Sequence, residues 1–209
     1  MKIIIFGATG TVGQHLVKQA LEQNHQVTAF GRNPEVLKHL NNLNFSFHQG
    51  DVLDREAVKN ALMGHDVVIC TLGAGRKGGL RAPGTKNIME GMTQLGIQRF
   101  ICQTTLGCGE SVKNLNFVWK HIMFGWLLKG AYKDHKLQED FVNRSPLDWT
   151  IIRPAAFTDG PLTGRYKHGF PGDEKEITLK ISRSDIAHFM LNNLVATSVN
   201  LRKALSISY

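Results

Sequence analysis

MKIIIFGATGTVG, residues 1–13, joins an apolar run of strand length to a loop with glycines at positions 7, 10 and 13. Residues 16–21 then place apolar side chains on one stripe of a helix. The three glycines allow a sharp turn, a close backbone approach to a pyrophosphate, and tight packing of helix on strand. The stretch is typical of the strand–turn–helix phosphate cradle of a doubly wound α/β protein. The alternative is a tight strand–helix turn with no ligand.

The length and composition indicate a globular protein with a sizeable core. The chain has 209 residues, of which 42% are hydrophobic and 20% charged, and its formal net charge is +8. An anionic cofactor or substrate would use part of this positive charge. No nucleic-acid-binding module and no basic–aromatic platform is present, so we predict no nucleic-acid partner.

The cysteines and the apolar runs indicate a cytoplasmic protein. Cys70, Cys102 and Cys108 are odd in number and contain no C-x-x-C pair, which favours reduced thiols in a reducing compartment. Met1 and Lys2 lead directly into the first predicted strand, so we expect no signal peptide. The most apolar run, Phe117–Leu128, is shorter than the roughly 18 residues of a membrane span. We therefore expect no membrane association, no metal site and a monomer.

Strand and helix patterns alternate along the chain. Strands are predicted at Met1–Phe6, Gln26–Phe30, Phe45–His48, Asp66–Cys70, Arg99–Gln103, Trp149–Arg153 and Ala204–Ser208. Helices are predicted at Gly13–Gln23, Pro34–His39, Asp54–Met63, Pro83–Leu95 and Ser184–Val195, the last of them capped by Ser184. A further long helical region is predicted to end near Asn143, with breaks at Gly125 and Gly130. An extended segment is predicted at Glu176–Ile181, and an irregular loop at Ala155–Gly172 is expected to lie over the site. This order predicts an α/β, single-domain, Rossmann-like, doubly wound and mostly parallel sheet with helices on both faces.

The end of the second strand indicates which dinucleotide is bound. Sites for NAD place an Asp or Glu there, about 20 residues after the glycines, to hold the ribose 2′-hydroxyl. This chain has Arg32 at that place. A guanidinium attracts a 2′-phosphate, so NADPH is predicted as the cofactor, with NADH weaker. The alternative is a solvated turn residue.

The remaining predicted cofactor residues lie at the carboxyl ends of the strands, where ligands bind in open parallel sheets. The pyrophosphate would be held by Gly7, Thr9, Gly10, Thr11, Val12 and Gly13. Asp51 either accepts a hydrogen bond from the adenine amino group or caps the next helix. Further predicted contacts are Val52, Thr71, Leu72, Gly73, Thr104, Pro154 and Ala155. Arg76 and Lys77 either approach phosphates or belong to a solvated basic loop.

Several motifs together resemble one family. These are the glycine motif at 7–13, Arg32, GDVL at 50–53, WTIIRP at 149–154, GPLTGRY at 160–166 and ISRSDIAHFM at 181–190. The chain resembles the atypical short-chain dehydrogenase/reductases with an NmrA-like Rossmann fold, and within them the biliverdin-IXβ reductases, also called flavin reductases. The resemblance runs from the first strand to about Leu194, and its GPLTG and SDIAHFM stretches are the more specific part.

The resemblance implies one NAD(P)-binding Rossmann domain over residues 1–209, with substrate-site loops mainly at 105–135 and 154–175. It implies an NADPH-dependent reductase of a flavin (FMN or riboflavin) or of a linear tetrapyrrole such as biliverdin. Thr105 stands where the family has a serine, which preserves a hydroxyl donor near the nicotinamide. Ala156 stands where a histidine is expected, and this departure puts the identity of the substrate in question. A non-catalytic NADP-binding regulator, as some NmrA-like proteins are, is the alternative from another class.

Candidate proton donors lie on the helix before Asn143. Tyr132 and Lys136 have the Tyr-x-x-x-Lys spacing of ordinary short-chain dehydrogenases and epimerases, in which lysine lowers the tyrosine pKa. A solvated helix face gives the same pattern, and the family alignment places His135 at the lysine position. His135 either donates to an acidic substrate or is structural. The aromatic residues of 117–126 either form the wall of a pocket or pack in the core.

Overall fold

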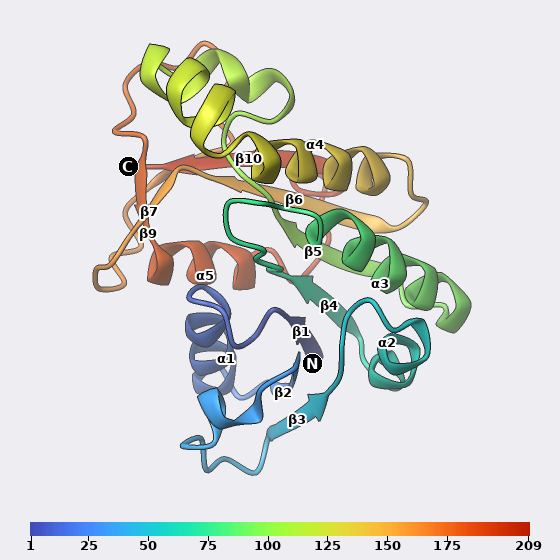
Figure 1. The fold of residues 1–209 in the computed structure, drawn as a ribbon. Coiled ribbons are helices and arrows are strands. Elements are labelled where there is room, and N and C mark those ends of the chain that lie inside the picture. Colours follow the sequence, from blue (N-terminus) through green and yellow to red (C-terminus); the bar gives the residue numbers. More distant parts are fainter.

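The computed structural model describes all residues, 1–209, and contains one eight-stranded sheet in the order β3-β2-β1-β4-β5-β6-β10-β8 (Figure 1). The strands are β1 (Lys2–Phe6), β2 (Gln26–Gly31), β3 (Phe45–Gln49), β4 (Val67–Cys70), β5 (Arg99–Gln103), β6 (Asp148–Pro154), β8 (Lys167–His168) and β10 (Lys203–Ser208). Every neighbouring pair is parallel except β8 with β10. The predicted Rossmann-like fold is therefore confirmed.

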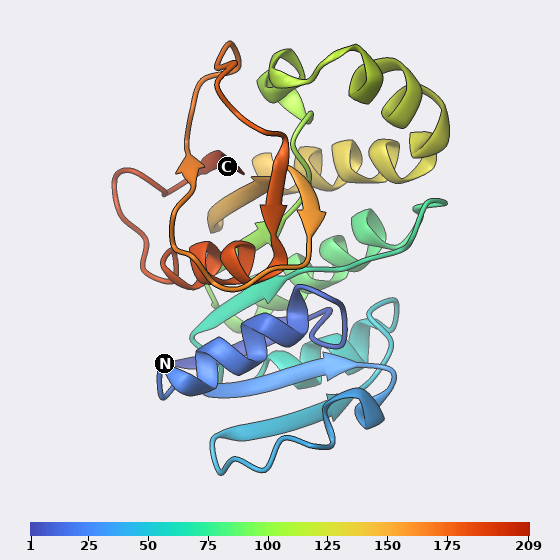
Figure 2. The same cartoon turned by 90° about the vertical axis from the view of Figure 1, so that its left-hand side faces the viewer.

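Helices cover both faces of this sheet. They are α1 (Gly13–Glu22), α2 (Arg55–Leu62), α3 (Arg81–Leu95), α4 (Lys129–Asn143) and α5 (Arg183–Leu191). Two 3-10 turns, at Pro34–Leu37 and Gly109–Asn114, and a π-helix at Val118–Leu127 complete the helical segments. Figure 2 shows α1 and α5 on one face of the sheet. On the other face α2, α3 and α4 pack side by side.

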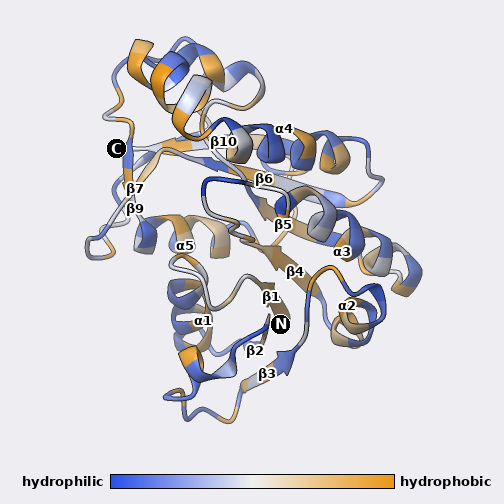
Figure 3. Ribbon diagram, viewed as in Figure 1, coloured by the Kyte–Doolittle hydropathy of each residue, from blue (hydrophilic) through white to orange (hydrophobic).

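The central strands are buried on both sides because their side chains alternate between two apolar layers. In β1, Ile3 and Ile5 belong to the core that includes α1 and α5, whereas Ile4 and Phe6 belong to the core under α2, α3 and α4. All four side chains are fully buried, and each contributes about 1.5–3 kcal/mol of burial free energy. Figure 3 shows the resulting contrast between apolar central strands and polar outer helix faces.

Strand order reverses at β1, which lies between β2 and β4. The crossovers on the two sides of β1 leave in opposite directions, so a crevice opens beyond the carboxyl ends of β1 and β4. This topology places the glycine loop after β1 at the position where open α/β sheets bind their ligands. None of the helices combines the length and the hydropathy that crossing a bilayer requires.

One predicted helix start is corrected by hydrogen bonds, and another is supported by them. Helix α5 begins at Arg183, and its cap is Ser182 rather than Ser184: the Ser182 hydroxyl accepts from the Asp185 backbone N–H at 3.0 Å. Ser184 instead lies against α1, where its hydroxyl accepts from the Gln19 side-chain amide at 3.1 Å. Asp54 caps α2 as predicted, because its carboxylate accepts from the Glu56 and Ala57 backbone N–H groups.

The segment after β6 has more regular structure than predicted. Within the expected irregular loop Ala155–Gly172, β7 (Ala156–Thr158) pairs in parallel with β9 (Lys180–Ser182), and β8 pairs with β10. Strands of two or three residues are too short to show an alternating pattern, which explains the difference. The long helical region also breaks at Leu128, between the π-helix and α4, rather than at Gly125.

Candidate functional site

The glycine loop folds back tightly onto the strands that flank it. Gly7 has φ +85°, and a Cβ there would lie 2.6 Å from the Thr71 carbonyl oxygen at the end of β4. A Cβ on Gly13 would lie 2.2 Å from the Gly7 carbonyl oxygen. Only glycine fits either position, so the loop brings the start of α1 against the carboxyl ends of β1 and β4.

The start of α1 is suited to an anion. No side chain caps this helix and its first turn contains no acidic residue, so its first backbone N–H groups remain available. Gly10, Thr11 and Val12 line a cleft of about 270 Å³ directly in front of it. A helix N-terminus with free amides attracts a phosphate through both hydrogen bonds and the helix dipole.

Most of the predicted cofactor residues line this one cleft. They are Gly7, Thr9, Gly10, Thr11, Val12, Arg32, Asp51, Val52, Thr71, Leu72 and Gly73. Gly13 does not line the cleft; its lack of a Cβ allows the start of α1 to pack against the Gly7 backbone. The lining also contains residues outside the predicted set of cofactor contacts, namely Phe30, Gly31, Gly50, Leu80, Arg81, Gln103 and Phe157.

Arg32 and Asp51 lie at the β2–β3 end of the cleft. Arg32 is exposed and forms no ion pair, so its guanidinium is available to a ligand. The Asp51 carboxylate accepts from the Leu53 backbone N–H at 2.9 Å, while Asp54 caps α2. The helix-cap alternative for Asp51 is therefore wrong, and its contact with adenine stays a prediction.

A second cavity, of about 350 Å³, lies beyond β5 and β6 and is mostly apolar. Its apolar wall comes from Leu106, Leu115, Trp119, Phe124, Leu128, Ala131 and Leu179. All three predicted catalytic residues, Thr105, Tyr132 and His135, line it. Thr104, Pro154 and Ala155, predicted as cofactor contacts, line this second cavity and not the first. Arg81, His135 and Phe157 line both, so the two cavities meet at these residues.

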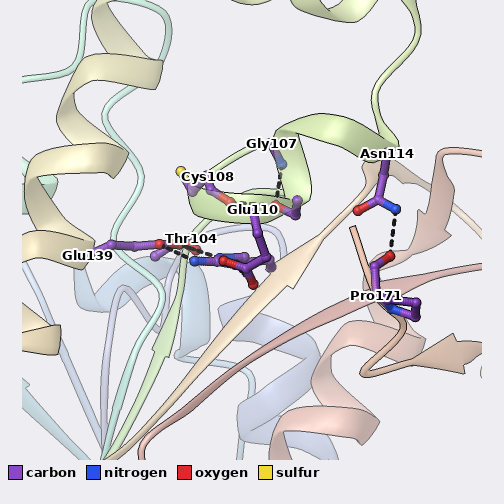
Figure 4. Close-up of polar contacts among 9 residues, drawn as sticks. Thr104, Gly107, Cys108, Glu110, Asn114, Glu139 and Pro171 are labelled. Carbon is purple, nitrogen blue, oxygen red and sulfur yellow. Dashed lines mark hydrogen bonds and ion pairs between the residues drawn. The ribbon is translucent and has the colours of Figure 1, made fainter. Parts of the chain in front are cut away.

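A buried ion pair supports one side of the second cavity (Figure 4). Arg153 donates to both oxygens of Glu139, at 2.9 and 2.7 Å, and Thr104 donates its hydroxyl to Glu139 at 2.6 Å. Arg153 also reaches Glu110, at 2.6 Å, on the 3-10 turn. The Thr104 hydroxyl therefore serves this network, which connects β5, β6 and α4 with the 3-10 turn.

The Tyr132 hydroxyl has a structural partner. It donates to the Gly107 carbonyl at 2.7 Å, and the ring stacks on Phe124 with centroids 4.5 Å apart. The Lys136 ammonium lies 5.3 Å from the ring centroid. Burial raises the pKa of Tyr132, whereas an acid–base tyrosine needs a lowered pKa. This geometry does not favour the dehydrogenase or epimerase alternative.

His135 is neutral and acts as an acceptor. Burial, followed by the nearby Arg81 charge, lowers the pKa of His135 to about 3. Its Nδ1 lies 3.3 Å from the Gln138 side-chain oxygen, and the Gln138 amide nitrogen donates to Thr85 at 2.9 Å. Nδ1 therefore carries the proton and Nε2 offers a lone pair. The predicted donation of a proton to an acidic substrate requires the charged ring, which this environment disfavours.

We expect His135→Gln to reduce the acid sensitivity of folding. The pKa of His135 is lowered in the folded state, so the unfolded chain binds the extra proton and stability falls as the pH drops below about 6.5. Between pH 7 and pH 5 the variant should lose about 1–2 kcal/mol less than the wild type. Urea unfolding at both pH values measures this, with His121→Gln, on the exposed π-helix, as the control. An identical loss in wild type and His135→Gln would contradict the lowered pKa of His135.

The aromatic residues of the π-helix divide between the two predicted roles. Trp119 and Phe124 line the second cavity, and Phe124 is also part of the core. Phe117 and Trp126 are 70% and 79% exposed, so they neither form a pocket wall nor pack in the core. The cysteines are buried and unpaired, as predicted.

Two contacts join α4 to the start of α3 and to the loop before it, although these segments are far apart in the sequence. Asp134, on α4, accepts from the backbone N–H groups of Leu80, Arg81 and Ala82 at 3.0–3.2 Å and so caps α3. Arg76, in the preceding basic loop, has an exposed side chain, and its carbonyl accepts from Ala131 at 3.1 Å. The loop is held by its backbone against the start of α4. Neither contact has a local sequence pattern.

The chain is similar to proteins with several assigned roles. It is 26% identical over 171 residues to the photosystem II assembly factor Ycf39 of Synechocystis sp., an alignment covering 79% of this chain and 48% of that protein. The chain thus spans about half the length of this curated relative.

Solved structures confirm the fold. ChuY, an anaerobillin reductase from Escherichia coli O157:H7, superposes with a TM-score of 0.82 at 24% identity, over 100% of this chain and 97% of ChuY. A short-chain dehydrogenase/reductase from Veillonella parvula in complex with NADP has a TM-score of 0.82 at 19% identity, over 100% and 94% of the two chains.

A family model described as NAD(P)H-binding matches residues 7–197 of the chain. The match begins at the first glycine of the cradle and extends beyond α5, so it includes both cavities. The narrower resemblance to biliverdin-IXβ reductases stays a prediction. The protein belongs to the NAD(P)H-binding family of Rossmann-fold proteins.

Proposed function

We propose that this protein is an NADPH-dependent reductase of a flat, conjugated acceptor such as a flavin or a linear tetrapyrrole. The observation that carries the proposal is the junction of the two cavities. The dinucleotide cleft and the apolar second cavity share Arg81, His135 and Phe157. An acceptor in the second cavity would therefore lie directly beside a cofactor in the first.

The residues of the cleft suit the cofactor. The free amides of Thr11 and Val12 would hold the pyrophosphate, Arg32 the 2′-phosphate, and Asp51 the adenine amino group. Bound NADPH would supply a hydride. The chain's own contribution is to position the acceptor on an apolar wall and to exclude water from it. No proton relay from Tyr132 is needed, because water can complete the reduction of a conjugated acceptor.

Oxidation of NADPH, followed at 340 nm with FMN, riboflavin and biliverdin as acceptors, tests the proposal. We expect turnover that depends on both enzyme and acceptor, with NADPH preferred over NADH.

The name of ChuY, a reductase with the same fold, supports a reductase role. The name of Ycf39, an assembly factor, supports the alternative of a non-catalytic NADP-binding regulator. Tight NADPH binding without turnover on any acceptor would favour that alternative. Cytoplasmic location and a monomeric state remain parts of the proposal.

Tyr132→Phe is expected to leave the turnover number within about twofold and to lower stability by about 1 kcal/mol. The substitution removes only the hydrogen bond to the Gly107 carbonyl, which is worth roughly that much. Initial rates at saturating NADPH and urea unfolding measure the two effects. Loss of activity by two orders of magnitude or more would instead support a dehydrogenase- or epimerase-type role for Tyr132 and Lys136.

A further inference from the structure

Arg81 is a buried cation without hydrogen bonds. It is 8% exposed and occupies the first turn of α3, at the junction of the two cavities. Its Nε and Nη1 atoms are enclosed and have no hydrogen-bond partner. Nη2 is the remaining guanidinium nitrogen, and it has no protein partner and is not enclosed. A guanidinium carries five N–H donors, so leaving them all unpaired inside a protein is costly.

The nearby carboxylate compensates for only part of this cost. Asp134 is the only acidic residue paired with Arg81, and its oxygen lies 3.6 Å from Nη1, beyond hydrogen-bond distance. Its oxygens already accept three backbone N–H groups at the start of α3. Burial lowers the pKa of Arg81 in spite of the Asp134 charge. The guanidinium therefore has an unused capacity to bind an anion.

The surroundings of Arg81 indicate where that anion would come from. Among the residues that line the second cavity, Arg81 is the only one that carries a charge, since His135 is neutral. The remaining wall is apolar or uncharged. A single cation in an apolar cavity favours a ligand with a large apolar body and an anionic group.

We propose that Arg81 binds a carboxylate of the acceptor, so that the site selects conjugated acceptors that carry a carboxylate side chain. This inference rests on the proposed function, because it places the acceptor in the second cavity. The same guanidinium also borders the cofactor cleft, and a cofactor phosphate is the other source of an anion. The experiment below distinguishes the two sources.

The test compares biliverdin, which carries two carboxylates, with its dimethyl ester, which carries none. Binding of each to the protein saturated with NADP⁺ is measured from the change in visible absorbance, without turnover. The variants are Arg81→Gln and Arg81→Lys, and Arg55→Gln is the control, since Arg55 is an exposed arginine on α2 that lines neither cavity. The affinity for NADPH is measured separately on each variant by fluorescence.

We expect wild type to bind biliverdin at least tenfold more tightly than the ester, because a charge-assisted Arg–carboxylate pair is worth that much. Arg81→Gln should remove this preference while leaving ester binding and NADPH binding within about twofold, and Arg81→Lys should restore part of it. Arg55→Gln should behave as wild type. Arg81→Gln also removes the cation paired with the buried Asp134 carboxylate, so thermal melting checks that the variant is folded before its binding is measured.

Four results would overturn the inference. Equal affinity of wild type for the acid and the ester means that no carboxylate is recognised. A tenfold loss of NADPH affinity in Arg81→Gln, with the acid-to-ester ratio unchanged, assigns the anion to the cofactor. Binding of neither compound to wild type means that the cavity does not accept bilins, whereas NADPH oxidation with flavins would still support the reductase. An unfolded Arg81→Gln, together with an Arg81→Lys variant that keeps the wild-type ratio, would assign Arg81 a structural role.

Discussion

Replacing Glu139 with alanine is expected to lower the free energy of unfolding by about 3–5 kcal/mol. Glu139 is buried and binds Arg153 through both oxygens, and it also accepts from Thr104. Its removal leaves the buried Arg153 guanidinium with one exposed partner, Glu110. An uncompensated buried charge is among the largest single-residue penalties in a protein.

The matched control is Glu110→Ala, which removes the other carboxylate bound to the same arginine. The Glu110 side chain is 65% exposed, so water can replace it, and we expect a loss of about 1 kcal/mol or less. Urea unfolding of both variants measures the difference. Equal, small effects would contradict the account of Arg153 and Glu139 as the buried pair that supports the second cavity.

Arg32→Ala is expected to weaken NADPH binding by about 10–100-fold and NADH binding by less than about twofold. Hydrogen bonds to charged groups are worth about 1.5–3 kcal/mol, and about 1.4 kcal/mol is a factor of ten. Arg32 has no ion pair to lose, so the change should not affect folding.

Fluorescence titration of both nucleotides measures the discrimination, with Arg55→Ala on α2 as the control, since Arg55 does not line the cleft. Arg32→Lys should retain part of the preference for NADPH, because it keeps the charge but loses the planar fork. An equal loss of NADPH and NADH would refute the assignment of Arg32 to the 2′-phosphate.

The cradle and the cleft are the parts of the site that the sequence predicts well. Gly10 and Gly13 approach backbone a few residues away, Gly7 approaches Thr71 at the end of the neighbouring strand, and Arg32 follows its own strand directly. Such local patterns determine where each group lies once strand order is known. The topology then brings the carboxyl ends of the strands together, so eleven of the predicted contacts line one cleft.

The parts that the sequence did not predict depend on contacts between distant residues. Asp134 caps α3 from another helix, α4. Arg81 becomes a candidate binding residue only because α3 starts where the two cavities meet. Thr104, predicted as a cofactor contact, donates instead to Glu139 across 35 positions. Ala156, expected in an irregular loop, lies in a short strand paired with β9. No local pattern indicates any of these partners.

The most direct test of the account is the fate of the hydride. NADPH deuterated at C4 of the nicotinamide is mixed with the enzyme and biliverdin, and the reduced pigment is analysed by mass spectrometry. The account predicts that deuterium from one face of the nicotinamide appears on a carbon of the product. A product without the label, or bound NADPH that stays intact in the presence of biliverdin and flavins, would contradict direct transfer between the two joined cavities.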